Sequence, residues 1–376
     1  MRIVLVGTAY PLRGGIAHYN ALLYRTLRER GHQVHFISFS RQYPSLLFPG
    51  RTQKDTGEEA IPIPAEPLLD SIGPVSWLRV ALRIRQYAPD MVIFKYWMPF
   101  FAPCYAAVAF LTKLLHHTRI LYICDNIVPH ERTVFDAPLT RLALAYVDHF
   151  VVMSDTVHQD LLSFVPGADV KRVPHPVYSI FGEAVPKAEA RRRLGLGEGP
   201  LILFFGYVRA YKGLHVLLEA MAEVLRKIPA RLLVAGEFYS DKSTYLELVE
   251  RLGLSSAVTI VDEFIPNQDV KLYYCAADVV VLPYLSATQS GIVQIAYNFN
   301  TPVITTNVGG LPDEVLDGVT GFVVPAGDPR ALANAIVAFF REKRGPQFAA
   351  QIARHKERYS WDQLAQAIEA FVRPRA

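Results

Sequence analysis

Short apolar runs alternate along the first half of the chain with longer stretches in which apolar positions recur at helical spacing. The short runs are rich in β-branched and aromatic residues, which is typical of strands. Strands that alternate with helices form βαβ units, whose strands are parallel. We therefore predict strands at residues 2–6, 34–38, 91–94, 119–123 and 150–153.

The same alternation restarts after a proline-rich and charged stretch at residues 173–200. The chain has 376 residues, which exceeds the roughly 250–300 at which a single hydrophobic core stops growing. The prediction is an α/β protein with two doubly wound domains joined near residues 175–185. The second domain is expected to have strands at residues 201–205, 231–235, 258–261, 278–283 and 302–305.

Composition narrows the class of protein. Hydrophobic residues make up 51% of the chain and charged residues 20%, which excludes a disordered chain. Cys104, Cys124 and Cys275 are widely separated and match neither a disulfide framework nor a metal site, so a reducing compartment is expected. The chain begins directly with a strand-like run and lacks the layout of a signal peptide. The expected location is the cytoplasm.

The basic excess lies in the first half of the chain. Residues 1–180 contain 18 Lys and Arg against 14 Asp and Glu, and the remainder contains 21 against 21. This excess is too mild for nucleic-acid binding, but it fits weak attraction to an anionic membrane surface. The apolar stretch at 96–115, which begins YWMPFF, is interrupted by prolines and a lysine. It is expected to form a helix packed on the sheet, with a helix at the membrane interface as the alternative.

Two cations stand where a predicted strand turns into a helix, in the segment GYVRAYKG at residues 206–213. Backbone N–H groups at a helix start are unpaired and the helix dipole is positive there, so such a turn binds anions. Arg209 and Lys212 therefore point to an anion with several charges, such as a diphosphate. The alternative is a solvated loop with two surface cations.

A second turn of this kind follows the predicted strand at 278–283. Ser290 and Gly291 are expected to begin a helix on the same carboxyl edge of the sheet as Arg209 and Lys212. A ligand with two phosphates would engage both turns, which favours diphosphate binding over the solvated loop.

The first turn of the N-terminal domain contains Gly14 and Gly15 ahead of a helix expected to run to Gly31. It does not form the G-x-G-x-x-G pattern, and no acidic residue follows the second strand, which disfavours a nicotinamide-dependent oxidoreductase. Paired glycines let a phosphate or sugar approach the backbone. His18 on this helix is a further candidate, with core or surface placement as the alternative.

Four segments taken together resemble the family-four retaining glycosyltransferases of the GT-B fold, also called glycosyl transferases group 1. They are GYVRAYKG, TPVITTNVGGLPDEV, GVTGFVVPAGD and the terminal YSWDQLAQAIEAFV, and the resemblance spans nearly the whole chain. It implies two Rossmann-like doubly wound domains facing a central cleft. Residues 1–178 would bind the acceptor, residues 179–358 the nucleotide sugar, and residues 359–376 would form a helix crossing back to the N-terminal domain.

The resemblance implies transfer of a hexose from a UDP- or GDP-sugar with retention of configuration. The basic excess and the aromatic segment YWMPFF of the first half favour a lipid-linked or cell-envelope glycan as the acceptor, with a soluble acceptor as the alternative. The nucleotide sugar is the donor substrate, and no cofactor is expected. No D-x-D pair stands out as a metal site, so a metal-independent reaction is expected. No nucleic-acid partner is expected. Peripheral association with a membrane is the further expectation. The alternatives are a noncatalytic nucleotide-sugar-binding partner subunit, and a phosphorylase or epimerase of the same architecture.

The resemblance also assigns roles to residues. Arg209 and Lys212 match the family's diphosphate contacts, and His130 in DNIVPHE matches its histidine beside the sugar. The family's E-x7-E pair falls on Ala287 and Ile295, so both carboxylates are missing. The remaining candidates for substrate binding are Gly14, Gly15, His18, Asn126, Ser286, Thr288, Gln289, Ser290, Gly291, Ile292, Gln294 and Glu314.

Two charged segments have structural interpretations. Glu314 belongs to a short helix that it and Asp313 would cap, which is the alternative to substrate binding. The run of arginines at 191–193 is expected to form a solvated helix face, because its side chains project in several directions.

Overall fold

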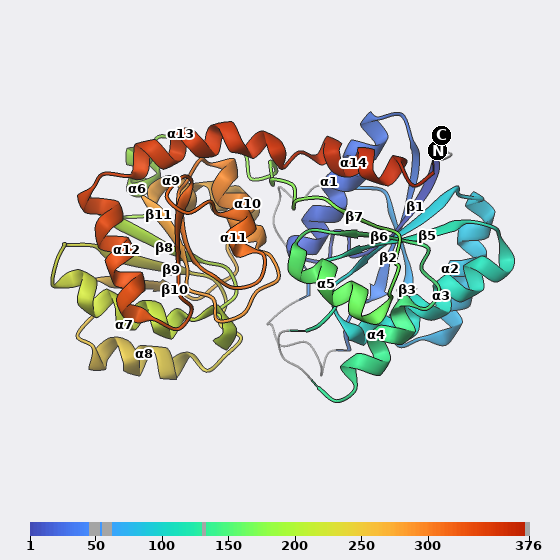
Figure 1. Ribbon diagram of the computed structural model, residues 1–376, viewed down its shortest axis with the longest axis horizontal. Helices are drawn as coiled ribbons and strands as arrows, with labels where there is room; N and C mark the ends of the chain where they lie inside the picture. Colours follow the sequence, from blue (N-terminus) through green and yellow to red (C-terminus); the bar gives the residue numbers. More distant parts are fainter. Residues whose placement is uncertain (45–52, 55–61, 130–132, 373–376) are drawn as a thin grey trace. The chain divides into compact units, whose positions relative to one another are not determined.

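The computed structural model describes residues 1–44, 53–54, 62–129 and 133–372, which divide into two compact units (Figure 1). Unit 1 comprises Met1–Pro176 together with Ser360–Ala376, and unit 2 comprises Val177–Tyr359. The chain passes from unit 1 to unit 2 at residue 177, whereas the boundary predicted from the sequence lies after residue 178. Its last segment belongs to unit 1.

Unit 1 is built on a seven-stranded parallel sheet with the strand order β3-β2-β1-β4-β5-β6-β7. Strand β1 is buried along its whole length except at its first residue, and β4 is buried throughout. Parallel strands covered by helices on both faces are apolar on both sides, which explains the continuous apolar runs. The strands are β1 (Arg2–Gly7), β2 (Gln33–Arg41), β3 (Ala65–Asp70), β4 (Met91–Tyr96), β5 (Arg119–Cys124), β6 (His149–Val152) and β7 (Val170–Arg172).

Helices cover both faces of this sheet (Figure 1). Helices α1 and α14 pack together, and α2, α3 and α4 pack side by side on the opposite face. This division follows from right-handed crossovers, because the chain runs one way from β1 to β2 and the other way from β3 onward. The helices are α1 (Gly15–Glu29), α2 (Pro74–Tyr87), the short η2 (Pro99–Phe101), α3 (Ala102–Leu115), α4 (Asp136–Leu144), α5 (Asp155–Phe164) and α14 (Trp361–Glu369).

Unit 2 has a six-stranded parallel sheet with the order β10-β9-β8-β11-β12-β13. Its core joins the strands to α7, α8 and α12. The strands are β8 (Leu201–Phe205), β9 (Arg231–Ala235), β10 (Val258–Val261), β11 (Val279–Leu282), β12 (Val303–Thr306) and β13 (Gly321–Val324). The helices are α6 (Lys187–Arg193), η3 (Ala210–Lys212), α7 (Leu214–Leu225), α8 (Lys242–Arg251), α9 (Asn267–Ala276), α10 (Gly291–Asn298), α11 (Leu311–Glu314), α12 (Pro329–Arg341), α13 (Gly345–His355) and η4 (Lys356–Arg358).

The prediction of two doubly wound parallel-sheet domains is confirmed. All ten predicted strands are present, and the structure adds β3, β7 and β13 at sheet edges. Strands at an edge are less buried, as the pattern of β7 shows, so their apolar signal is weak. In each unit the strand order reverses beside the first strand, at β1 and β4 in unit 1 and at β8 and β11 in unit 2. The carboxyl ends of strands at such a reversal are where open α/β sheets bind ligands.

The aromatic segment YWMPFF does not form an exposed face. Tyr96, Pro99 and Phe101 are buried, and Trp97, Met98 and Phe100 are partly buried against the unit 1 core. The ring of Trp97 packs on Phe101 with centroids 4.5 Å apart. The expectation that the stretch at 96–115 packs on the sheet is confirmed, and the alternative of an aromatic segment at a membrane interface is wrong for these side chains. Among the residues that the structure describes, no helix has the length and apolar character needed to cross a bilayer.

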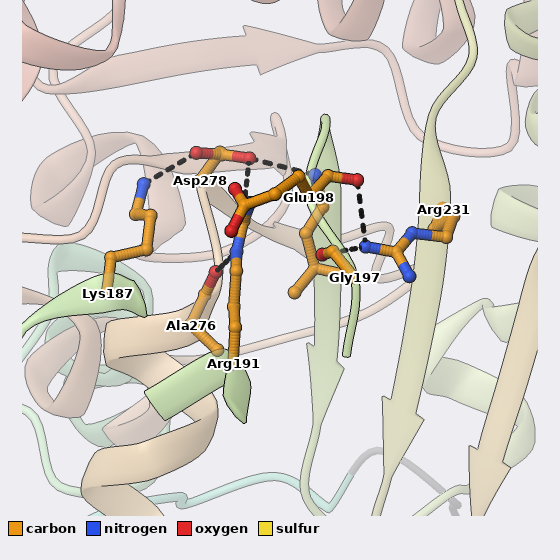
Figure 2. Close-up of polar contacts among 8 residues, drawn as sticks. Lys187, Arg191, Gly197, Glu198, Arg231, Ala276 and Asp278 are labelled. Carbon is orange, nitrogen blue, oxygen red and sulfur yellow. Dashed lines mark hydrogen bonds and ion pairs between the residues drawn. The ribbon is translucent and has the colours of Figure 1, made fainter. Parts of the chain in front are cut away.

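The arginine run at 191–193 is also not a uniformly solvated face. Arg191 is 5% exposed and lies at the amino edge of the unit 2 sheet (Figure 2). Its Nε donates to the carbonyl oxygen of Ala276 at 3.0 Å, and one of its terminal nitrogens pairs with Asp278 at 3.0 Å. The Asp278 carboxylate also accepts the Leu201 N–H at 2.8 Å. Arg191 thus ties α6 to the starts of β8 and β11.

Candidate functional site

The turn after β8 requires glycine at two positions. Gly206 has φ +95° and Gly213 has φ +69°, and both values lie in the left-handed region that favours glycine. A Cβ on Gly213 would lie 2.0 Å from the carbonyl oxygen of Pro283, just after β11. Leu285 N–H donates to the Tyr211 carbonyl at 2.7 Å. The turn that carries the two predicted cations is therefore fixed against the loop after β11.

The two cations of this turn differ in burial. Arg209 is partly exposed, and its guanidinium lies 5.3 Å from the centroid of the Tyr239 ring. Lys212 is only 8% exposed, so the alternative of two solvated surface cations does not hold for Lys212. Burial, together with the nearby charge of Arg209, lowers the pKa of Lys212 to about 8. An anionic ligand that binds beside this desolvated ammonium would stabilise its charged form.

The second turn begins α10 as the sequence predicts. Ser290 is the N-cap, and its hydroxyl accepts the Ile292 N–H at 3.3 Å. A Cβ on Gly206 would lie 3.3 Å from Lys212 Nζ and 3.2 Å from Ile292 Cδ1. The ammonium and the first turn of α10 therefore flank the same glycine. The structure brings the two predicted anion-binding turns together at the reversal between β8 and β11.

The loop at 286–289 leads into α10. Thr288 is buried at 6% exposure, and Ser286 and Gln289 are partly exposed. The carbonyl of Thr288 accepts the Gly310 N–H at 3.1 Å, and a Cβ on Gly309 would lie 1.7 Å from the carbonyl oxygen of Ala287. The glycine pair after β12 therefore closes directly on this loop. Of the two positions that lack the family's glutamates, Ala287 is 7% exposed and Ile295 is 8% exposed.

Glu314 is buried behind the start of α10. It is 5% exposed, and its Oε2 accepts the Ser290 N–H at 3.3 Å. Burial raises the pKa of Glu314 to about 8, and the Ser290 N–H and the fully buried Gln294 only partly oppose this rise. The carboxyl is therefore mostly neutral at pH 7. In this position Glu314 and Gln294 support the helix start from the inside.

One acidic residue at this edge was missed by the sequence analysis. Glu237 lies two residues after the end of β9 and is 2% exposed. Gly236 has φ +146°, and a Cβ there would lie 2.2 Å from the carbonyl oxygen of Gly206. A glycine and an acid immediately after a predicted strand were the available signal.

In unit 1 the predicted glycine turn follows β1. Gly14 is the N-cap of α1, with φ 113°, and Gly15 is the first helical residue. His18 is partly exposed on the first turns of α1. Asn20 on the same helix is buried and donates to the Thr8 carbonyl at 2.8 Å, which holds the turn against the helix.

A buried ion pair lies at the carboxyl edge of the same sheet. Lys95 on β4 is 2% exposed and its Nζ is 2.6 Å from Asp125, just after β5. The Lys95 ammonium also lies 3.4 Å from the centroid of the Tyr19 ring of α1. Burial lowers the pKa of Lys95, and Asp125 opposes that shift. The signal for this pair in the sequence was a lysine within the apolar run MVIFKY. That signal was not used in the prediction.

The remaining candidates of unit 1 follow β5. Asn126 is partly exposed, and its Nδ2 lies 3.4 Å from the carbonyl oxygen of Trp97. His130 lies outside the residues that the structure describes, so its role remains a prediction.

Both units thus carry polar and glycine-rich turns at the carboxyl edge of a Rossmann-like sheet, which is the arrangement that the GT-B resemblance implies. Comparison with known families agrees. Residues 13–178 match the model of Glycosyltransferase Family 4, and residues 199–342 match that of Glycosyl transferases group 1. The chain belongs to this glycosyltransferase family, which confirms the resemblance seen in its sequence.

Curated relatives include D-inositol 3-phosphate glycosyltransferases. The chain is 34% identical to that of Corynebacterium urealyticum over 54% of its length and 48% of the relative. It is 27% identical to that of Acidothermus cellulolyticus over 94% and 84%. The chain matches only about half the length of several of these relatives, including that of Corynebacterium urealyticum.

Solved structures share the fold at low sequence identity. Anabaena HepE, determined in complex with UDP, superposes with a TM-score of 0.76 over 99% of each chain at 17% identity.

Proposed function

We propose that this protein transfers a hexose from a nucleoside-diphosphate sugar to an acceptor, with retention of the anomeric configuration. The observation that carries the proposal is the meeting of Lys212 and the first turn of α10 at Gly206. Together with Arg209 they present two cations and a helix N-terminus at one sheet edge. A diphosphate is the ligand whose charge and size suit such a site.

The same groups would stabilise the reaction. Breaking the bond between the sugar and the diphosphate places negative charge on the leaving phosphate. Arg209, Lys212 and the Gly291 N–H at the start of α10 would stabilise that charge as it develops. In a retaining reaction the leaving phosphate accepts the proton of the acceptor hydroxyl on the same face of the sugar, so no strong protein base is required. His130 is proposed to orient the sugar or that hydroxyl.

The acceptor is proposed to bind unit 1, at the edge formed by Gly14, Gly15, His18 and Asn126. A lipid-linked or cell-envelope glycan is the acceptor class that we propose. The names of the curated relatives add a phosphorylated polyol as a second class to test.

A panel of UDP-, GDP- and ADP-sugars tests the proposal, with nucleotide release measured in the presence of glycolipid and polyol phosphate acceptors. Arg209→Ala and Lys212→Ala should each lower kcat/KM by an amount equivalent to about 2–4 kcal/mol. Arg251→Ala is the matched control, because Arg251 is exposed on α8, away from these turns. Near-parental kcat/KM in both site variants would contradict the assignment.

Two other outcomes point to the alternative functions. Donor binding without sugar release for any acceptor would identify a noncatalytic nucleotide-sugar-binding subunit. A requirement for free phosphate would identify a phosphorylase.

A further inference from the structure

Exposed large apolar side chains are concentrated on one part of unit 1. The described residues contain thirteen of them, and nine lie between residues 72 and 142. A surface distributes such side chains singly unless it meets an apolar partner or a membrane. The nine are Ile72, Val75, Leu78, Leu82, Phe110, Leu114, Val134, Phe135 and Leu142.

Helix α3 is apolar on its outer side as well as on its inner side. Its inner side, which includes Tyr105 and Val108, is fully buried in the core. Its outer side carries Phe110 at 45% exposure and Leu114 at 70%. The residues beside them at 103, 107 and 111 are also apolar and are partly exposed. A surface helix normally places polar residues outward, so the apolar outer side of α3 indicates a surface that contacts an apolar partner.

Helix α2 continues this surface. Val75, Leu78 and Leu82 are 66%, 47% and 42% exposed, and their spacing places them on one side of the helix. The opposite side of α2, with Val80 and Ile84, is buried in the core that α3 shares. Because α2 and α3 lie side by side on the sheet (Figure 1), their outward sides form one surface. We call Val75, Leu78, Leu82, Phe110 and Leu114 the α2–α3 face.

The charges on these two helices have a single sign. Helix α2 contains Arg79, Arg83 and Arg85, α3 contains Lys113, and neither helix contains Asp or Glu. Arg83 pairs with Glu66 and Lys113 with Asp148. Arg79 and Arg85 are exposed beside the apolar side chains of α2.

The basic character continues past the end of α3. A hollow of about 690 Å³ is lined there by Lys113, His116, His117, Arg119 and Arg2, with Asp90 and Asp148 among the other lining residues.

We propose that the α2–α3 face docks unit 1 on the surface of an anionic lipid bilayer. Apolar side chains would enter the boundary between headgroups and acyl chains, and the arginines would meet the anionic headgroups. A second copy of this chain is a poorer occupant, because a twofold contact through this face would bring the arginines of both copies together. The proposal deepens the lipid-linked acceptor of the proposed function, since it places the acceptor-binding unit at the membrane.

Co-sedimentation with vesicles tests the docking without any need for activity. The full chain is mixed with phosphatidylcholine vesicles with and without phosphatidylglycerol, at low and at physiological salt. The wild-type chain should sediment with the anionic vesicles, and more strongly at low salt. The double variant F110E/L114E should lower the partition coefficient at least about tenfold, because two apolar anchors are replaced by charges that the anionic surface repels. The double variant R79E/R85E should also lower it at least about tenfold, since each nearby cation contributes about 1 kcal/mol.

Leu246→Glu is the matched control. Leu246 is 42% exposed on α8 of unit 2, so this variant should bind vesicles as the wild-type chain does. Circular dichroism and the thermal shift produced by nucleotide should be unchanged in all variants, which separates failure of docking from failure of the fold or of the proposed donor site. Wild-type protein that stays in the supernatant under every condition would overturn the proposal. So would a dimer, measured by light scattering, that F110E/L114E dissociates.

Discussion

The charge of Lys212 should control how tightly the protein binds a nucleoside diphosphate. An ordinary lysine has a pKa of 10.5, and burial beside Arg209 lowers the pKa of Lys212 to about 8. A bound diphosphate favours the charged form and raises the pKa again. Lys212 is therefore charged and ready to bind below about pH 8, and it must take up a proton to bind above that pH. Affinity should fall as the pH rises through 8.

The size of the effect follows from the shift. Suppose that the ligand binds only when Lys212 is charged, and that the pKa of Lys212 returns to near its ordinary value in the complex. The ligand should then bind about tenfold more weakly at pH 9 than at pH 7. The phosphates do not contribute to this change, because their last proton is lost near pH 6, as for other phosphate esters, at roughly one unit below the range. Lys212→Met removes the charge but keeps much of the apolar stem. It should weaken binding at pH 7 by about 2–3 kcal/mol and leave only the part of the pH dependence that Glu314 contributes.

Glu314 also titrates near this pH, so it needs a control. Its pKa is raised to about 8, and its ionisation would place a negative charge behind the Ser290 N–H, which also weakens anion binding. Glu314→Gln removes that contribution and leaves Lys212 unchanged. Calorimetry with UDP, GDP and ADP between pH 6.5 and 9.5 measures the affinities of the wild-type chain and both variants. A pH dependence that persists in Lys212→Met but vanishes in Glu314→Gln would refute the role of Lys212.

Three further predictions concern the stability of the two units and the metal dependence of the reaction. Arg191→Met should lower the free energy of unfolding by about 2–4 kcal/mol, because Asp278 loses a buried partner; urea denaturation checks this against Arg192→Met, whose side chain is exposed. Glu369→Gln should cost about 2 kcal/mol at neutral pH, since hydrogen bonding to Arg30 lowers the pKa of Glu369 to about 2. The depressed pKa stabilises the folded state above the ordinary value of 4.5, so the difference from the wild-type chain should shrink as the pH falls from there toward 2. Sugar transfer should survive EDTA, and activity that is lost on chelation and restored by magnesium would contradict a metal-independent reaction.

The sequence was most informative where a residue's role depends on its neighbours along the chain. Strands buried on both faces must be apolar throughout, so the runs at 91–94 and 201–205 identify β4 and β8 directly. Ser290 was found as a helix start because an N-cap needs a hydroxyl ahead of an apolar-periodic stretch. Glycines such as Gly213 mark the turns because only glycine tolerates that backbone beside Pro283.

Features that depend on distant contacts were not predictable in this way. Three consecutive arginines are typical of a solvated helix face, yet Arg191 is buried. Its hydrogen bonds go to the Asp278 carboxylate and the Ala276 carbonyl, which lie far along the chain. The apolar segment at 96–115 contains no signal for which of its sides faces outward, so the exposure of Leu114 could not be predicted. Lys95 was overlooked because its partner Asp125 follows another strand, β5.

The departures from the family pattern leave the donor site with less negative charge. Position 287 is an alanine buried beneath Gly309, and position 295 is a buried isoleucine, so neither family carboxylate is present. The carboxyl group that does lie behind α10 belongs to Glu314, and burial keeps it mostly neutral at pH 7. At positions 287, 295 and 314 the site therefore has little negative charge at pH 7, and a further acid at this sheet edge is Glu237, after β9. Such a site should bind the diphosphate strongly and depend less on carboxylate contacts to the sugar and ribose. We therefore expect that changing the base or the sugar alters the affinity less than removing one phosphate does. Comparing nucleoside monophosphates with diphosphates by calorimetry checks this, and equal affinities for the two would contradict it.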